Sequence, residues 1–105
     1  MTLHQFDVCR IIGADARGGV DLAVVLQDDA LSEAATRVVA PLIPLDEKPQ
    51  INRVTPVVTL DGVRYLVAVH LVTVLGRRNL GQSVGNLRDH ERAFKNALDA
   101  VFFGV

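Results

Sequence analysis

The sequence has 105 residues, 50% of them hydrophobic, which is enough to bury one core but too few for a second. Its 11 basic and 12 acidic side chains leave a net charge of -1, so it lacks the positive excess with which proteins capture nucleic acid or anionic lipid. We therefore expect a single domain, residues 1–105, with no direct nucleic-acid binding, whose partners are recognised by shape and a few contacts.

The cysteine content and the first residues indicate a compartment. Cys9 is the single cysteine, so it has no partner for an internal disulfide, and its apolar alternating neighbourhood predicts a buried thiol. The start, MTLHQFDV, lacks the basic and apolar regions of a signal peptide. No apolar run approaches the ~18 residues of a membrane span. These features predict a soluble, cytoplasmic protein with no membrane contact.

The first half of the chain predicts three strands. Residues 6–10 alternate before the glycines at 13, 18 and 19, which is typical of a strand that leads into a loop. Residues 22–27 predict a second strand that pairs with the first as an antiparallel hairpin. A polar connection over 28–36, with room for a helical turn, leads to a third apolar run at 37–44. Because Pro41 and Pro44 cannot donate to a ladder, we expect this strand at a sheet edge or at a bend between sheets.

The clearest local signal is a hairpin over residues 57–69. Two β-branched runs flank Asp61-Gly62, a dipeptide that readily takes the positive φ angles of a type I′ turn. A further apolar run covers 71–75. Glycines at 76, 81 and 85 then predict an irregular stretch.

From Asn86 the hydrophobic period becomes helical. Asn86 is a candidate N-cap, with Asp89 three residues later. On a helical wheel one stripe holds the apolar residues Phe94, Ala97, Leu98, Val101, Phe102 and Val105. The pattern predicts a C-terminal helix that packs this stripe, Phe102 included, into the core.

Phe103 falls on the opposite face of that wheel, beside Arg92, Asn96 and Asp99. Leaving a phenylalanine in water forfeits roughly 1.5–3 kcal/mol that burial would gain, so an aromatic ring on a polar face commonly marks a contact surface. In the alternative interpretation the helix frays after Val101, and Phe103 folds back onto the sheet or onto a dimer mate.

One short motif imitates a hydrolase site. Residues 81–85, GQSVG, match G-x-S-x-G and are followed by Asp89 and His90. A nucleophile elbow needs a buried strand before the serine and a helix directly after it, whereas two arginines precede this motif and the expected helix begins later. Asp89 and His90 are neighbours that point about 100° apart on a helix, so they do not line up behind Ser83. We expect turn glycines here.

No other cluster indicates catalysis or a cofactor. His4, His70 and His90 fall in three different segments, without a second ligand at metal-binding spacing. Asp28-Asp29 follows a strand, where adjacent carboxylates more often begin a turn than share a proton. We therefore expect a protein that is not an enzyme and that needs no cofactor or metal.

Five short blocks keep a fixed order along nearly the whole chain. They are Gln5-Phe6-Asp7-Val8, Leu22-x-Val24-x-x-Gln27-x-Asp29, Arg37-Val38-Val39-x-Pro41-Leu42, Pro56-Val57-Val58 and Lys95-Asn96-Ala97-Leu98 running to Phe102-x-Gly104. In these blocks the sequence resembles the CcdB family of toxins, with length differences confined to residues 10–21 and 43–55.

The resemblance implies a fold and a function. Members of this family are mainly β (α+β) homodimers, built from an SH3-like barrel of antiparallel strands with a C-terminal α-helix. They bind the gyrase A protein of DNA gyrase, act as topoisomerase poisons that trap the gyrase–DNA cleavage complex, and are released by the antitoxin CcdA. A CcdB-like chain is thus expected to be the toxin of a type II toxin–antitoxin module, to act by binding and to have a CcdA-like antitoxin as its second partner.

The resemblance also implies the gyrase-binding residues. The family's critical contact is its last three residues, which here are Phe103, Gly104 and Val105. The other contact positions fall on Asp28, Ala30, Leu31, Glu91, Arg92 and Asp99. Phe103 stands where the best-known member has tryptophan, Asp28 replaces a serine, and Arg92 and Asp99 replace asparagines.

Two alternatives remain open at this stage. MazF-like toxins share the barrel and cleave RNA, for which Arg77, Arg78 and His70 are the candidate residues in this sequence. The substituted contact positions also suit a relative that keeps the fold for a shifted target or without toxicity.

Overall fold

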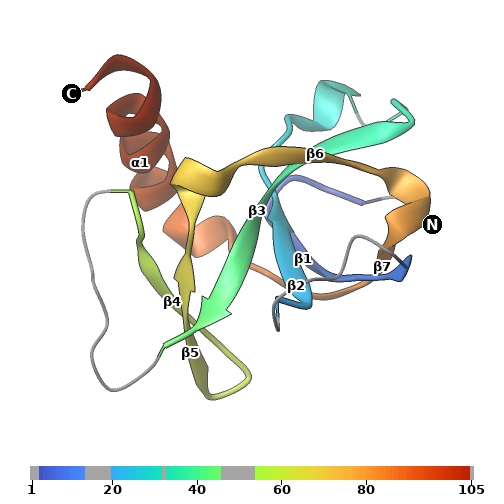
Figure 1. The fold of residues 1–105 in the computed structure, drawn as a ribbon, viewed down its shortest axis with the longest axis horizontal. Coiled ribbons are helices and arrows are strands. Elements are labelled where there is room, and N and C mark those ends of the chain that lie inside the picture. The colour runs from blue at the N-terminus through green and yellow to red at the C-terminus, as the bar shows by residue number, and fades with distance from the viewer. Residues whose placement is uncertain (1–2, 14–19, 32, 46–53, 105) are drawn as a thin grey trace.

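The computed structural model describes residues 3–13, 20–31, 33–45 and 54–104. They form a curled antiparallel sheet with one C-terminal helix (Figure 1). The elements in chain order are β1 (Asp7–Ile11), β2 (Leu22–Val25), β3 (Thr36–Pro44), β4 (Val57–Leu60), β5 (Val63–Val67), β6 (Thr73–Gly76), β7 (Leu80–Asn86) and α1 (Glu91–Phe103). The strand order is β4-β5-β3-β2-β1-β7, with β6 also paired to β3. The predicted mainly β, barrel-like fold with a C-terminal helix is confirmed, as is the β1–β2 hairpin.

β3 lies in the middle of the sheet, so the expectation of an edge strand was wrong. Its first half pairs with β6 as far as Val39, and its second half pairs with β5 from Leu42 onward. Pro41 lies between these two partners, and its carbonyl accepts the Ala68 N–H. Pro41 therefore lies where the pairing with β6 has ended and the pairing with β5 has not yet begun. The N–H that proline lacks costs the sheet no ladder hydrogen bond at this position.

The hairpin between β4 and β5 is confirmed. Leu60 pairs with Val63, and between them Asp61 has a φ of 51° and Gly62 a φ of 80°. Two consecutive positive φ angles are what a type I′ turn requires, and aspartate followed by glycine adopts them at low cost.

Residues 80–86 form a strand, although their glycines predicted an irregular stretch. β7 pairs with β1, with Val8 opposite Gly85 and Cys9 opposite Ser83, and the register shifts between these two pairs. Because glycine has no side chain to contribute to the two-residue hydrophobic period of a strand, the sequence of this segment did not predict a strand. β1 supplies the hydrogen-bonding partner that the local sequence does not reveal.

The C-terminal helix begins later than predicted. Asn86 ends β7, and its Oδ1 accepts the Arg88 N–H at 2.9 Å, so it caps the 3₁₀ turn Arg88–His90 rather than α1. α1 begins at Glu91 and ends at Phe103. The next residue, Gly104, has a left-handed φ of 72°, and its N–H donates to the Ala100 carbonyl. This is a common glycine C-cap.

Two hydrophobic clusters hold the domain together. α1 buries Phe94 and Ala97 against one face of the curled sheet, where the Phe94 ring lies 5.7 Å from the Phe6 ring between centroids. The second cluster contains Cys9, which is fully buried as predicted. Burial, with a smaller contribution from Asp7, raises the pKa of the Cys9 thiol to about 11. Among the described residues, no helix combines the length and apolarity needed to cross a bilayer.

Candidate functional site

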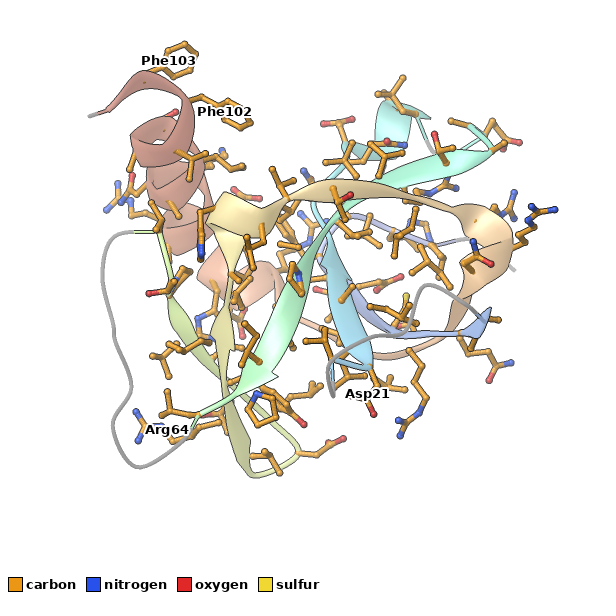
Figure 2. The ribbon with its side chains drawn as sticks, in the orientation of Figure 1. Asp21, Arg64, Phe102 and Phe103 are labelled. Atoms are coloured by element: carbon orange, nitrogen blue, oxygen red, sulfur yellow. The ribbon has the colours of Figure 1, made fainter. Side chains whose placement is uncertain are left out.

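Phe103 lies in the last turn of α1 with 76% of its surface exposed (Figure 2). The helix continues through Phe103, so the alternative interpretation, in which it frays after Val101, is wrong. Asp99, one turn earlier, and Arg92 are exposed on the same side of the helix. The sequence prediction of an outward-facing ring on a polar stripe is confirmed.

Phe102 is also exposed, and its predicted place in the core was wrong. Its exposed fraction is 62%, whereas Leu98 and Val101, on the same stripe, are partly buried against the core. Figure 2 shows both terminal rings at the free end of α1, beyond the strands. The apolar stripe thus continues for one turn after the surface that it packs against has ended.

A groove of about 390 Å³ lies between the end of α1 and the segment that follows β2. Its lining residues are Leu26, Gln27, Asp28, Leu31, Val38, Val72, Thr73, Val74, Leu98 and Phe102. The groove is mostly apolar, and Asp28 is the one charged residue among those that line it. Asp28 and Leu31, predicted site residues from the first third of the chain, are brought together here with α1.

The residues 28–31 present their side chains from a short 3₁₀ turn, Asp29–Leu31. Asp28 Oδ1 accepts the Ala30 N–H at 2.7 Å, and the Asp28 carbonyl accepts the Leu31 N–H at 3.0 Å. Gln27 Nε2 donates to the Leu31 carbonyl at 3.1 Å. With its backbone satisfied in this way, the turn leaves Ala30 and Leu31 exposed to solvent.

Several exposed apolar residues surround the groove. Leu31, Val74 and Phe102 are each more than half exposed. Leaving this much apolar surface in water is unfavourable, and a contiguous patch with a polar rim is typical of a protein-binding surface. We call the groove together with Phe103 the contact surface.

Two predicted residues lie far from Phe103. Glu91 and Arg92 are in the first turn of α1, and at 1.5 Å per residue Glu91 is about 18 Å along the axis from Phe103. Glu91 is engaged within the chain, with Arg88 Nη1 at 3.7 Å and Lys95 Nζ at 3.4 Å from its carboxylate. Arg92 is exposed and free of that cluster. Val105, the last predicted contact, lies outside the described residues.

Sequence reasoning missed part of the contact surface. It placed Phe102 in the core, and it recorded residues 71–75 only as an apolar run, although Val74 of β6 is exposed beside the groove. The alternation of side chains along a strand was the available signal, because it puts neighbours on opposite faces. Which face is covered, however, depends on where α1 and β3 lie.

The hydrolase-like motif is part of β7. Ser83 pairs with Cys9 in the sheet, and its Oγ donates to the Gly85 carbonyl at 2.9 Å. The expectation of turn glycines at 81 and 85 was therefore wrong, because both belong to a strand. In the described part of the chain no three histidine, cysteine or acidic residues gather as a metal site.

The candidate ribonuclease residues are separated in the fold. His70 lies in the 3₁₀ turn Val69–Leu71, before β6, and Arg77 and Arg78 begin the 3₁₀ turn Arg77–Asn79, after it. β6 runs between these two turns, so the three side chains start from opposite ends of one strand (Figure 1).

Comparison with known proteins gives a family and a fold. The family model described as CcdB protein matches residues 5–104. A solved structure of an endoribonuclease in complex with its cognate antitoxin, from a mycobacterial species, is similar with a TM-score of 0.77 and 15% identity, over 94% of this chain and 93% of that chain. At this identity the likeness shows a shared fold. No curated protein sequence matches.

Proposed function

The chain belongs to the CcdB family, and on this premise we propose that it is the toxin of a type II toxin–antitoxin module. In this proposal it binds the gyrase A protein of DNA gyrase in the cytoplasm and traps the gyrase–DNA cleavage complex. A CcdA-like antitoxin neutralises it. The similar fold of an endoribonuclease that was solved in complex with its cognate antitoxin supports the second partner.

The observation that carries this proposal is the contact surface. A ring with 76% exposure at the end of α1 stands beside an apolar groove that contains two further gyrase-binding positions, Asp28 and Leu31. Aromatic side chains commonly supply the largest contributions to protein–protein binding. Phe103 is the wedge in this interpretation, and Gly104, whose left-handed φ of 72° caps the helix, directly follows it.

We also propose that the protein is a homodimer. Exposed apolar residues outside the contact surface, namely Ile12, Leu71 and Val84, support this, since a second copy of the chain would remove part of this apolar area from water. A two-fold axis would place two contact surfaces on one face, and two modest contacts would then add to one tight bivalent interaction. Sedimentation of the purified protein should give twice the 11.4 kDa of one chain. A monomer at micromolar concentration would contradict the dimer.

The toxin acts by binding and not by catalysis in this proposal. The separation of His70 from Arg77 and Arg78 supports it, because RNA cleavage needs its acid, base and phosphate-binding groups around one bond. Purified protein incubated with RNA should leave the RNA intact. Cleavage that is lost in a His70→Ala variant would instead establish the MazF-like alternative.

Expression in a gyrase-sensitive bacterium tests the main proposal. The wild-type chain should arrest growth and co-purify with a fragment of gyrase A, while Phe103→Ala should grow and bind at least about tenfold more weakly. Val63→Ala is the matched control, because Val63 is an exposed apolar residue in the β4–β5 hairpin, away from α1. Toxicity that survives Phe103→Ala would contradict the mechanism. A wild-type chain that neither arrests growth nor binds gyrase A would point to the relative with a shifted target.

A further inference from the structure

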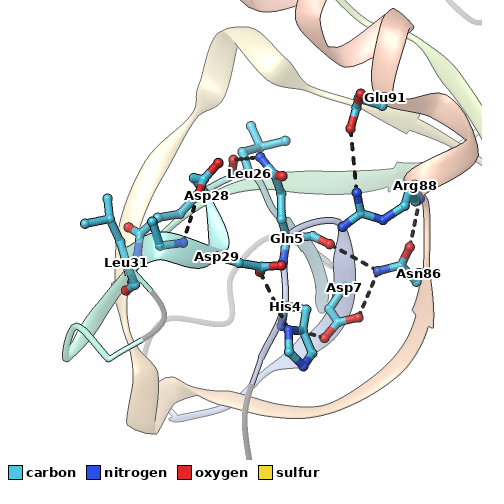
Figure 3. Close-up of polar contacts among 12 residues, drawn as sticks. His4, Gln5, Asp7, Leu26, Asp28, Asp29, Leu31, Asn86, Arg88 and Glu91 are labelled. Carbon is cyan, nitrogen blue, oxygen red and sulfur yellow. Dashed lines mark hydrogen bonds and ion pairs between the residues drawn. The ribbon is translucent and has the colours of Figure 1, made fainter.

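Asp29 lies among residues 28–31, which include the proposed gyrase-binding residues Asp28, Ala30 and Leu31, but it does not line the groove. Its carboxylate instead meets the N-terminal segment (Figure 3). Oδ1 accepts the Gln5 N–H at 2.7 Å and lies 3.7 Å from His4 Nδ1. The turn that presents Ala30 and Leu31 is thus attached through Asp29 to residues about two dozen positions earlier in the chain.

Gln5 makes two further hydrogen bonds, which connect the segment after β2 to the end of β7. Its Nε2 donates to the Leu26 carbonyl at 3.1 Å, just before the contact residues. Its own carbonyl accepts Asn86 Nδ2 at 3.1 Å. One residue therefore bonds both to the segment that carries Asp28 and to the end of β7.

Asn86 completes the connection to the helix. Its Nδ2 also donates to Asp7 Oδ1 at 3.0 Å, and its Oδ1 accepts the Arg88 N–H at 2.9 Å. Arg88 begins the 3₁₀ turn that leads into α1 and pairs with Glu91 at the first position of the helix. Hydrogen bonds thus connect Asp29 through Gln5 and Asn86 to Arg88, and the Arg88–Glu91 ion pair extends the connection to the start of α1.

The backbone at the centre of this network has an unusual conformation. Phe6 has a φ of 69°, which few residues other than glycine adopt, in a turn closed by the Asp7 N–H on the His4 carbonyl. The buried Phe6 ring lies against Phe94, and the Arg88 guanidinium stands 5.4 Å from its centroid. Such a conformation persists only where its surroundings hold it, which is the property of a segment that orients its neighbours.

We infer that Asp29 is a positioning residue for the contact surface. It holds the residues 28–31 to the N-terminal turn, which Gln5 and Asn86 tie to α1, and so keeps both halves of the surface in one geometry. This inference rests on the proposed function, because its consequence is gyrase affinity. Asp29 acts through Leu31 and does not itself touch gyrase.

Three variants test the inference by their affinity for a gyrase A fragment. Asp29→Ala removes the acceptor of the Gln5 N–H and should weaken binding about fivefold, a modest effect because the site is partly exposed. Asp29→Asn keeps an oxygen acceptor and should bind within about twofold of wild type. Asp21→Ala removes an equal charge from an exposed ion pair with Arg10 and should also bind like wild type.

A double-mutant cycle separates positioning from direct contact. If Asp29 acts through Leu31, the loss caused by Asp29→Ala should largely disappear in a Leu31→Ala background. Losses that simply add would show that Asp29 contacts gyrase, and this would overturn the inference. Equal loss in Asp29→Asn and Asp29→Ala would do the same, because charge rather than the hydrogen bond would then matter.

Amide hydrogen exchange gives a readout that needs no gyrase. Asp29→Ala should speed exchange at the Gln5 and Leu31 amides by about tenfold, since one loses its acceptor and the other its anchored turn. Asp21→Ala should leave both rates unchanged. Unchanged rates in Asp29→Ala overturn the inference even if the wild type binds gyrase. Faster exchange with no gyrase binding by any chain overturns the proposed function and leaves the positioning of the turn established.

Discussion

Leu31 and Phe102 line one groove, although Leu31 ends the 3₁₀ turn after β2 and Phe102 lies in the last turn of α1. Both are apolar, and both are more than half exposed. A partner side chain that enters the groove therefore meets the two together. The groove joins the two segments to which the family resemblance assigned gyrase contacts.

Leu31 and Phe102 line the same groove, so the losses of gyrase A affinity caused by Leu31→Ala and by Phe102→Ala should be coupled. We expect each to weaken binding by about 1–2 kcal/mol and the double variant to lose less than the sum, by at least ~0.5 kcal/mol. Isothermal titration of the four proteins measures the coupling. Strictly additive losses would show that the two residues contact separate parts of the partner.

Replacing Phe103 by tryptophan should strengthen gyrase binding. Indole offers a larger stacking area and a stronger cation–π face, so against a target arginine the gain should be about 0.5–1 kcal/mol, or two- to fivefold in affinity. Titration against the same gyrase A fragment measures it, with Val63→Trp, at an exposed position outside the contact surface, as the control. A weaker Phe103→Trp complex would indicate a site shaped for the smaller ring.

Phe94 and Phe103 should differ sharply in their contribution to stability. Phe94 is buried in the core, so Phe94→Ala should lower the free energy of unfolding by about 3–5 kcal/mol. Phe103 is mostly exposed, and Phe103→Ala should change it by less than about 0.5 kcal/mol. Urea unfolding followed by circular dichroism compares them. A large loss of stability in Phe103→Ala would mean that the variant loses toxicity because it unfolds, and not because it lacks a contact with gyrase.

Gly104→Ala should destabilise the C-terminal end of α1. The residue has a φ of 72°, where a Cβ atom costs roughly 1 kcal/mol, and its N–H caps the Ala100 carbonyl. Gly104→Asn should cost less, since asparagine tolerates the left-handed region. Thermal unfolding of the two variants should rank them in this order. Equal stability of Gly104→Ala and wild type would show that the cap is not formed in solution.

The Cys9 thiol should make stability depend on alkaline pH. Its pKa is raised from 9.0 to about 11 in the folded chain, so the folded state holds the proton more tightly than the unfolded state. The stabilisation is complete below pH 9 and should be lost as the pH rises from about 9 to about 11. The free energy of unfolding measured across this range should decline less for Cys9→Ala than for the wild type.

The raised pKa should also make the Cys9 thiol unreactive. At pH 8 the thiolate fraction, and with it the rate of alkylation of the native protein, should be about 100-fold lower than for a free thiol of pKa 9.0.

Local patterns in the sequence were sufficient for the β4–β5 hairpin and for the outward direction of Phe103. Asp61-Gly62 supports its turn through its own backbone preferences, and the helical period alone places Phe103 opposite Phe94. The family resemblance named Asp28 and Leu31, but no local pattern indicated that they lie beside α1.

The central place of β3, the strand at 80–86 and the exposure of Phe102 were decided by tertiary structure. Pro41 is compatible with a central strand only because two partner strands divide β3 between them, and β7 exists only because β1 pairs with it. Phe102 has the angular position of a core residue, but the sheet beneath it ends first. Hydrophobic period and secondary-structure propensity are properties of a few neighbouring residues. The burial of a side chain depends instead on which distant segments of the chain pack against it.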